Sequence, residues 1–197
     1  IEYANSITSN DLENLLSIYS SDDFEGRQTG QRGDKLAANF LRQFYINNQI
    51  EPALNTVDYF QPYQLNLPGK MYTRNYTFPE SLRTYDRYAE GKNIVDTQNV
   101  AAIIKGSTYP ESYVIITGHL DHVGIDGDVV YNGADDNGSG TVSILEIAQA
   151  FQIAVSDGKR PKRSIVFLHV SGEEEGLLGS EYYVNNPLYP IEETFAN

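Results

Sequence analysis

The sequence of 197 residues contains 40% hydrophobic and 21% charged residues, which is typical of one globular domain and excludes a disordered or collagen-like chain. Its 14 basic and 27 acidic residues give a net charge of −13, so we expect no binding to nucleic acid or to an anionic membrane surface. Because the sequence contains no cysteine, any metal ion would be held by nitrogen and oxygen ligands.

Two features of the sequence bear on where the protein resides. No apolar run reaches the ~20 residues that a membrane helix needs, so we expect a soluble chain. The sequence begins at Ile1 rather than Met, which is typical of a trimmed N-terminus, and removal of a signal peptide is one ordinary cause. We therefore expect a secreted or periplasmic protein.

Two amphipathic helices are predicted in the first fifty residues. Asn10 and Glu13 form a candidate capping pair at the start of the first helix. The apolar faces of the two helices comprise Leu12, Leu15, Leu16 and Tyr19, and then Ala37, Phe40, Leu41 and Phe44. Residues 57–65 alternate as in a strand, and the polar, tyrosine-rich stretch 68–92 is predicted to be irregular.

The second half of the sequence alternates short β-branched runs with one long helical pattern. Strands are predicted at 100–104, 113–117 and 165–170. Ile144, Ile147, Ala148 and Phe151 mark a helix between the last two strands, 158–163 is a basic turn, and 176–184 is a short final helix. This order is typical of a βαβ unit with a parallel sheet, within a single domain that spans 1–197.

Three polar segments are predicted to meet at one edge of this sheet. Residues 118–124 and 171–176 each follow a strand, and residues 133–141 precede the crossover helix. The carboxyl ends of parallel strands lie at the same edge, where α/β proteins bind their ligands. Histidine and carboxylates gathered without cysteine are a ligand set that suits zinc or a similar divalent metal. The sequence therefore predicts a metal site.

Each candidate also has a purely structural interpretation when it is taken alone. His119 could be an ordinary hydrogen-bonded histidine, and residues 173–175 could be an exposed charged face. Residues 135–138 could be a helix-capping turn. Only their order along the predicted fold favours a metal site. His122 is a minor candidate for a substrate-side group, and His169 is expected to be a core histidine. Residues 126–128 are expected to form a hairpin turn rather than a calcium site.

The same segments resemble the motifs of a known enzyme family. Residues 118–121 (GHLD), 133–140 (GADDNGSG) and 173–180 (EEEGLLGS) are similar, in this order, to motifs of the zinc aminopeptidases of peptidase family M28, the bacterial leucyl-aminopeptidase-like and glutamate-carboxypeptidase-like enzymes. A looser similarity covers 23–27, and the resemblance extends from about residue 20 to the end. It implies the zinc-exopeptidase (phosphorylase/hydrolase-like) fold, a three-layer α/β/α architecture with a largely parallel central mixed sheet.

The resemblance also implies a role for each motif residue. His119 corresponds to a terminal ligand of one zinc, Asp136 to the carboxylate that bridges two zincs, and Glu174 to a ligand of the other. Asp121 corresponds to the group that orients the His119 imidazole through its other nitrogen. Glu173 corresponds to the general base, which is not a ligand. The family often has a cis peptide bond after the bridging aspartate, here Asp136.

The expected function is therefore a zinc-dependent aminopeptidase that hydrolyses N-terminal peptide bonds through a metal-activated water. A single-zinc glutaminyl-cyclase-like or carboxypeptidase-like enzyme and a non-catalytic binding module of the same fold remain alternatives. The family pattern uses five ligands and this sequence supplies three, so we expect a chain truncated at its C-terminus, without the family's last strands and ligands. Such a chain should bind at most one zinc tightly, show little activity, and self-associate through exposed sheet edges. If it bound two, His122 would be the first substitute ligand.

Overall fold

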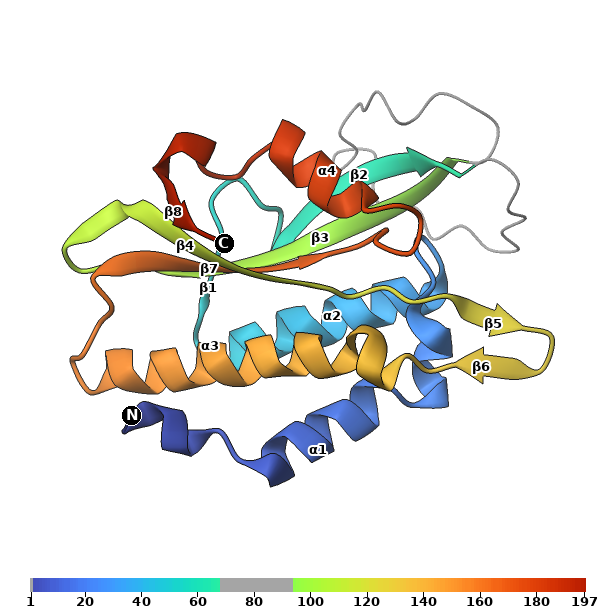
Figure 1. Cartoon of the computed structure of the whole chain (residues 1–197), viewed down its shortest axis with the longest axis horizontal. Coiled ribbons are helices and arrows are strands. Elements are labelled where there is room, and N and C mark those ends of the chain that lie inside the picture. The colour runs from blue at the N-terminus through green and yellow to red at the C-terminus, as the bar shows by residue number, and fades with distance from the viewer. Residues whose placement is uncertain (1, 68–93) are drawn as a thin grey trace.

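A mixed β-sheet forms the middle layer of the protein, whose structure is a computed structural model that describes residues 2–67 and 94–197 (Figure 1). The predicted irregular stretch 68–92 lies outside these described residues. Within them the sheet has six strands in the order β1-β3-β7-β4-β8, with β2 also paired to β3. The strands are β1 (Glu51–Pro52), β2 (Phe60–Asn66), β3 (Ile94–Ile104), β4 (Tyr109–His119), β7 (Arg163–Val170) and β8 (Thr194–Ala196).

Helices lie on both faces of this sheet, as the α/β/α expectation requires. The helices are α1 (Ser9–Tyr19), α2 (Arg32–Asn47), α3 (Gly140–Ser156) and α4 (Leu178–Asn185). Shorter helical turns are η1 (Tyr3–Ser6), η2 (Asp22–Arg27), the π-helical η4 (Ala134–Ser139) and η5 (Ile191–Glu193). Helices α2 and α3 cover one face of the sheet, α1 packs against α3 on the side away from the sheet, and α4 lies on the other face (Figure 1). None of the helices in the described ranges is long and apolar enough to cross a membrane.

The two strands beside β7 run in opposite directions, as in a mixed sheet. Strands β4 and β7 are parallel, and α3 lies between them in the sequence, so the predicted βαβ unit is confirmed. Strand β3, whose direction was not predicted, runs antiparallel to β7, with Val100 opposite His169 and Ile104 opposite Ile165, so the sheet is mixed. Only four residues, 105–108, connect β3 to β4, whereas a parallel return needs a crossover of about a dozen or more.

The central strands bury side chains on both faces, which explains their nearly continuous apolar sequences. On β7, Phe167 belongs to the core beneath the three-helix layer, together with Leu41 of α2 and Leu145 of α3. Its neighbour Leu168 points to the opposite core, where Tyr183 of α4 is also buried. Successive residues of a strand point to opposite faces, so each strand ties the two cores together.

Two local predictions have different outcomes. The cap of α1 is wrong: Asn10 and Glu13 lie inside the helix, and the Thr8 hydroxyl accepts a hydrogen bond from the Asp11 amide at 3.2 Å. Thr8 and Asn10 are both favourable caps, and nothing local distinguishes them. The hairpin turn at 126–128 is confirmed, because β5 (Gly124–Asp126) and β6 (Val129–Tyr131) pair antiparallel on either side of it.

Candidate metal centre

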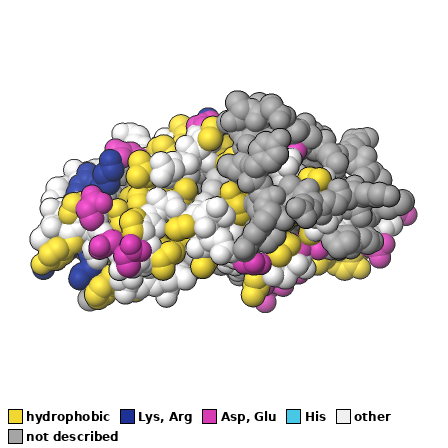
Figure 2. Space-filling view, turned by 90° about the horizontal axis from the view of Figure 1, so that it is seen from above, with side chains coloured by type: hydrophobic (Ala, Val, Ile, Leu, Met, Phe, Trp, Pro, Cys, Tyr) yellow, Lys and Arg dark blue, Asp and Glu magenta, His cyan; other side chains and the backbone are white. Residues whose placement is uncertain are grey.

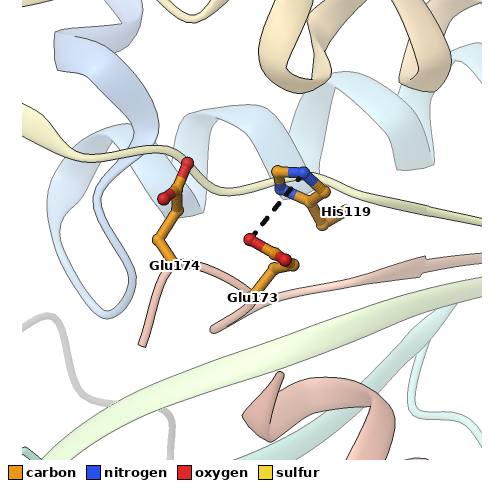
Figure 3. Close-up of side chains that lie close together, drawn as sticks. All are labelled: His119, Glu173 and Glu174. Carbon is orange, nitrogen blue, oxygen red and sulfur yellow. Dashed lines mark ion pairs between the residues drawn. The ribbon is translucent and has the colours of Figure 1, made fainter. Parts of the chain in front are cut away.

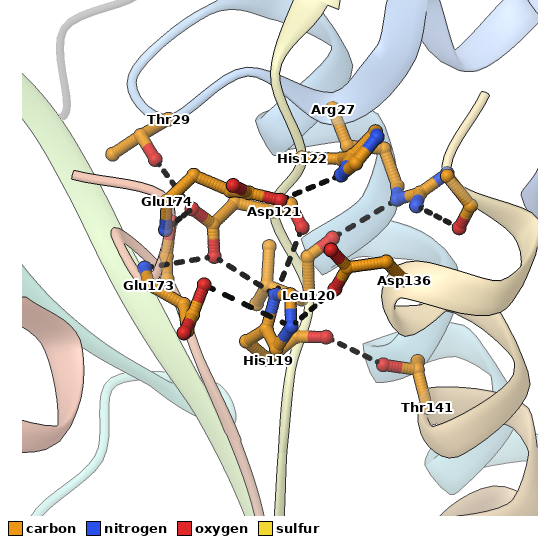
Figure 4. Close-up of polar contacts among 12 residues, drawn as sticks. Arg27, Thr29, His119, Leu120, Asp121, His122, Asp136, Thr141, Glu173 and Glu174 are labelled. Carbon is orange, nitrogen blue, oxygen red and sulfur yellow. Dashed lines mark hydrogen bonds and ion pairs between the residues drawn. The ribbon is translucent and has the colours of Figure 1, made fainter. Parts of the chain in front are cut away.

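His119 is the last residue of β4, and its ring is held in one orientation. The Thr141 hydroxyl donates to the His119 carbonyl oxygen at 2.8 Å, which ties the strand end to α3. The Nδ1 atom of His119 lies 3.1 Å from the Asp121 carbonyl oxygen and 3.8 Å from the Asp121 carboxylate. The orienting contact is therefore mainly with the main chain of Asp121 rather than with its carboxylate. It leaves Nε2 facing Asp136, with 3.0 Å between Nε2 and Oδ1 (Figure 4).

Asp136 lies in the π-helical turn that precedes α3. The turn begins after Gly133, whose φ of +53° favours glycine, and it closes with a hydrogen bond from the Gly138 amide to the Gly133 carbonyl. The peptide bond between Asp136 and Asn137 is cis, as the resemblance implies. The Asp136 side chain is 66% exposed, so this carboxylate is accessible from solvent.

Glu173 and Glu174 follow β7 and face the end of β4. The Oε2 atom of Glu173 lies 4.0 Å from His119 Nε2 (Figure 3). Glu174 points to the other side of the centre, where its Oε1 atom lies 2.6 Å from Nδ1 of His122. The amides of the two glutamates donate to the two carboxylate oxygens of Asp121, at 3.2 and 3.3 Å. Asp121 thus sets the backbone from which both glutamates project.

Asp121 is a fully buried carboxylate beneath the site. Burial raises its pKa to about 6, and the nearby Asp34 acts in the same direction. The hydrogen bonds from the Thr29 hydroxyl, at 2.8 Å, and from the Glu173 amide oppose this shift. Sequence reasoning missed Thr29, because the loose similarity at 23–27 ends before it and threonine carries no motif by itself.

Arg27 joins the loop after β4 to the turn that carries Asp136. Its guanidinium is buried and donates to the carbonyl oxygens of Leu120, Asn132 and Gly133 at 3.0, 2.7 and 2.8 Å. Burial lowers the pKa of Arg27. The similarity at 23–27 includes this residue, but its function as a link between the two loops was not predicted.

Ser171 lies just before the two glutamates in the sequence, and side chains from three other elements hold it in place. Its amide donates to Asn99 Oδ1 on β3 at 3.1 Å, and its hydroxyl donates to Asp34 on α2 at 2.8 Å. The hydroxyl of Tyr63 on β2 donates to the Ser171 carbonyl oxygen at 2.7 Å. These contacts, which the sequence did not reveal, fix the path of the chain as it leaves β7.

All five residues singled out from the sequence therefore gather at one edge of the sheet, and His122 joins them. Potential ligand atoms lie within 4.8 Å of one another in two groups, which are His119 with Glu173 and Glu174, and His122 with Asp136 and Glu174. One imidazole with two carboxylates is a donor set that fits zinc. Glu173 belongs to the first group only, and Glu174 belongs to both.

His169 lies apart from this centre. It is fully buried on β7, and its Nε2 atom lies 2.7 Å from the Tyr45 hydroxyl. Its Nδ1 atom has no hydrogen-bond partner among the described residues. Burial lowers the pKa of His169 to about 3. The prediction of a core histidine is confirmed.

A cavity of about 370 Å³ adjoins the centre on the α4 side of the sheet. His119 and Glu173 lie at its edge, and Asn137 is a further polar group in its wall. Most of the remaining wall is apolar, with side chains that include Ile115, Leu168, Val170, Tyr183 and Val184. The centre is therefore open to a molecule that approaches from this side.

Solved structures with a similar fold include two enzymes. A zinc aminopeptidase from Bacillus subtilis superposes with a TM-score of 0.59 at 16% identity, covering 93% of this chain and 66% of the other. A glutaminyl cyclase from an Acidobacteriales bacterium superposes with a TM-score of 0.60 at 14% identity, covering 94% and 55%. At these identities the likeness establishes the α/β fold and not the activity.

Curated proteins with similar sequences are much longer than this chain. A probable glutamate carboxypeptidase, VP8, from Zea mays is 35% identical over 101 residues, which are 51% of this chain and 13% of that protein. A vacuolar membrane protease from Tuber melanosporum is 32% identical over 184 residues, which are 90% of this chain and 17% of that protein. The chain thus spans less than a fifth of the length of either relative.

A family profile covers the half of the chain that carries the centre. Residues 99–197 match Peptidase family M28, and this range includes β4, the Asp136 turn, β7 and both glutamates. By this match, the chain belongs to peptidase family M28.

Proposed function

We propose that this chain carries the metal centre of a zinc-dependent exopeptidase that acts as an aminopeptidase. The observation that supports the proposal most strongly is the convergence of His119, Asp136 and Glu174 at the edge of the sheet, with Glu173 beside them. Three carboxylates packed this closely repel one another unless a cation lies among them. Membership of a peptidase family makes peptides the expected substrates.

His119, Asp136 and Glu174 are the proposed zinc ligands. Bound zinc supplies a Lewis acid that polarises the scissile carbonyl and makes an attacking water more acidic. Asp136 would hold the metal together with residues on both sides of the centre, because its carboxylate lies 3.0 Å from His119 Nε2 and within 4.8 Å of a ligand atom of Glu174. Asp121 holds the His119 ring and the glutamate backbone in place.

Glu173 is the proposed general base. Its carboxylate is one-third exposed and lies at the edge of the cavity, 4.0 Å from the His119 ring. A carboxylate in this position can accept a proton from the attacking water at Oε2 and return it to the leaving amine. Its backbone is fixed by Asp121, so the side chain keeps its position while the proton moves.

The cellular location and the organisation of the chain are also proposals. The proposed location is secreted or periplasmic, and the proposed organisation is a single domain over 1–197. One sheet to which both halves of the described chain contribute strands supports the single domain. Both proposals can be checked on the natural protein by cell fractionation and by limited proteolysis.

Metal analysis combined with a chromogenic aminoacyl substrate tests the function. For the 197-residue chain we expect at most one tightly bound zinc, because both candidate ligand groups share Glu174. We expect little turnover, because the sequence supplies three of the five ligands that the family resemblance implies. Turnover is therefore measured on the protein purified from its source, which should cleave leucine 4-nitroanilide and leave the N-acetylated substrate intact. Release of C-terminal residues would favour a carboxypeptidase instead, and cyclisation of N-terminal glutamine without hydrolysis would favour a cyclase. Zinc binding without any of these reactions would favour a binding module.

A further inference from the structure

His122 lies in the loop after β4, and its ring is held from two sides. Its amide donates to the Arg27 carbonyl oxygen at 3.2 Å, which fixes the backbone. Gly133 packs against the ring so closely that a Cβ atom on this glycine would lie 2.5 Å from the ring carbons. The His122 side chain is only 14% exposed. Packing therefore fixes the position of the His122 ring, unlike that of a mobile side chain on the surface.

The ring reaches the carboxylates from a different side than His119 does (Figure 4). Its Nδ1 atom lies 2.6 Å from Glu174 Oε1, and a potential ligand atom of His122 lies within 4.8 Å of those of Asp136 and Glu174. Adjacent ligand atoms around a tetrahedral zinc lie about 3.3 Å apart, given bonds of about 2.0 Å. Ligand atoms that lie within 4.8 Å of one another need to approach by no more than about 1.5 Å to reach this spacing, and the Asp136 side chain is 66% exposed.

We propose that His122 is a metal ligand in this chain and forms a zinc site together with Asp136 and Glu174. The inference rests on the proposed function, because Asp136 and Glu174 serve both. One imidazole and two carboxylates are sufficient protein ligands for a zinc that keeps one position open. His122 thereby supplies the third protein ligand on the Glu174 side of the centre, and His119 serves the other side.

A different explanation of the 2.6 Å contact is that His122 only orients Glu174 by a hydrogen bond. The variant His122→Asn separates the two. The Asn side-chain amide can take the place of the ring Nδ1–H as a donor to Glu174, but an amide is a poor zinc ligand. His122→Ala removes both functions. Asp135→Asn is the matched control, because it removes an exposed carboxylate beside Asp136 that belongs to neither ligand group.

The experiment is a titration of the metal-free 197-residue chain with Zn²⁺ against a chromogenic chelator, with circular dichroism of each variant to verify its fold. Loss of a residue that merely orients a ligand costs about 10- to 100-fold in metal affinity, so loss of a ligand should cost about 100-fold or more. We expect this loss in both His122→Ala and His122→Asn, and little change in Asp135→Asn. X-ray absorption at the zinc edge should show less imidazole scattering in both His122 variants than in the wild type.

The outcomes separate the inference from the proposed function. Wild-type affinity and unchanged imidazole scattering in a folded His122→Asn variant would overturn the ligand role. If Asp136→Ala and Glu174→Gln weakened zinc binding while both His122 variants did not, the proposed zinc centre would be supported. The ligand role of His122 would then be rejected. If the variants of His122, Asp136 and Glu174 all weakened zinc binding and His119→Ala did not, the ligand role of His122 would be supported. His119 would then be rejected as a zinc ligand.

Discussion

His119 Nε2 lies 3.0 Å from Asp136 Oδ1, although one residue ends a strand and the other lies in a turn that opens a helix. If both bind zinc, replacing either with alanine should reduce the zinc retained after dialysis. Each replacement removes one of the three proposed ligands, His119, Asp136 and Glu174, and so weakens the binding of the ion. Atomic emission measurements on the purified chain would check this, with Asp135→Asn as the control. Unchanged zinc content in both alanine variants would remove the case for a metal at this edge.

Glu173 lies near His119 and is not expected to bind the metal. In the active protein, Glu173→Gln should therefore retain zinc and the fold but lose about 100- to 10,000-fold in turnover, the usual cost of losing a general acid or base. Steady-state kinetics on an aminoacyl substrate would measure the loss, and zinc content would be measured on the same sample. A variant that lost its zinc would instead identify Glu173 as a ligand, as its grouping with His119 and Glu174 allows.

Thr29 is expected to support the site from beneath through its hydrogen bond to Asp121. Thr29→Val keeps the shape and removes the hydroxyl, which should destabilise the chain by about 1.5 to 3 kcal/mol because the acceptor is a buried, ionisable group. Zinc affinity should fall by about 10- to 100-fold, since Asp121 orients the neighbouring residues. Urea unfolding and zinc titration would measure the two effects. Thr29→Ser retains the hydroxyl and should lose little in either measurement.

The buried His169 should make the stability of the chain depend on pH. Its pKa is lowered to about 3 in the folded chain and is about 6.5 when unfolded, so only the unfolded chain gains this proton as the pH falls below 6.5. Stability is therefore lost on acidification, by about 2 kcal/mol between pH 7 and pH 5 from this group alone. Urea unfolding of the wild type and of His169→Gln at both pH values would isolate the contribution. An equal pH dependence in the two proteins would contradict it.

The edge of the sheet beyond β4 is only partly covered. Within the described chain, β8 pairs with Tyr113 and Val114, which leaves the end of β4 that leads to His119 without a partner strand on that side. The face that carries α4 and β8 also shows hydrophobic side chains among polar and charged ones (Figure 2). Unpaired strand edges promote association between chains, so we expect concentration-dependent oligomers in analytical ultracentrifugation.

A charge at this edge should oppose the association. Thr117 is exposed on β4, and Thr117→Lys should shift the protein towards monomer. Ser156→Lys adds the same charge at an exposed position at the end of α3 and should leave the association unchanged. A wild-type chain that stays monomeric at high concentration would contradict the prediction.

Much of the fold and the centre could be predicted from sequence because the signals are local. The helical spacing of apolar residues indicated α2 and α3, and the β-branched runs indicated β4 and β7, since each pattern reflects one face of one element. The segments that contain His119 and Asp136 stand next to those elements, so their meeting at one edge follows from a parallel pair with a helical crossover.

Other features depend on which elements pack together, and no local pattern records that. Nothing in the sequence near Thr29 indicates its hydrogen bond to Asp121. Nothing near Ser171 indicates that its amide donates a hydrogen bond to Asn99. The antiparallel direction of β3 was set by the short connection to β4, together with the insertion of β7 between the two strands. The approach of His122 to Glu174 likewise depends on the folded loop. His122 follows His119 by three residues, and this spacing has a fixed geometry on a helix but none on a loop. Side chains far apart in sequence acquire their partners only when burial brings their elements together.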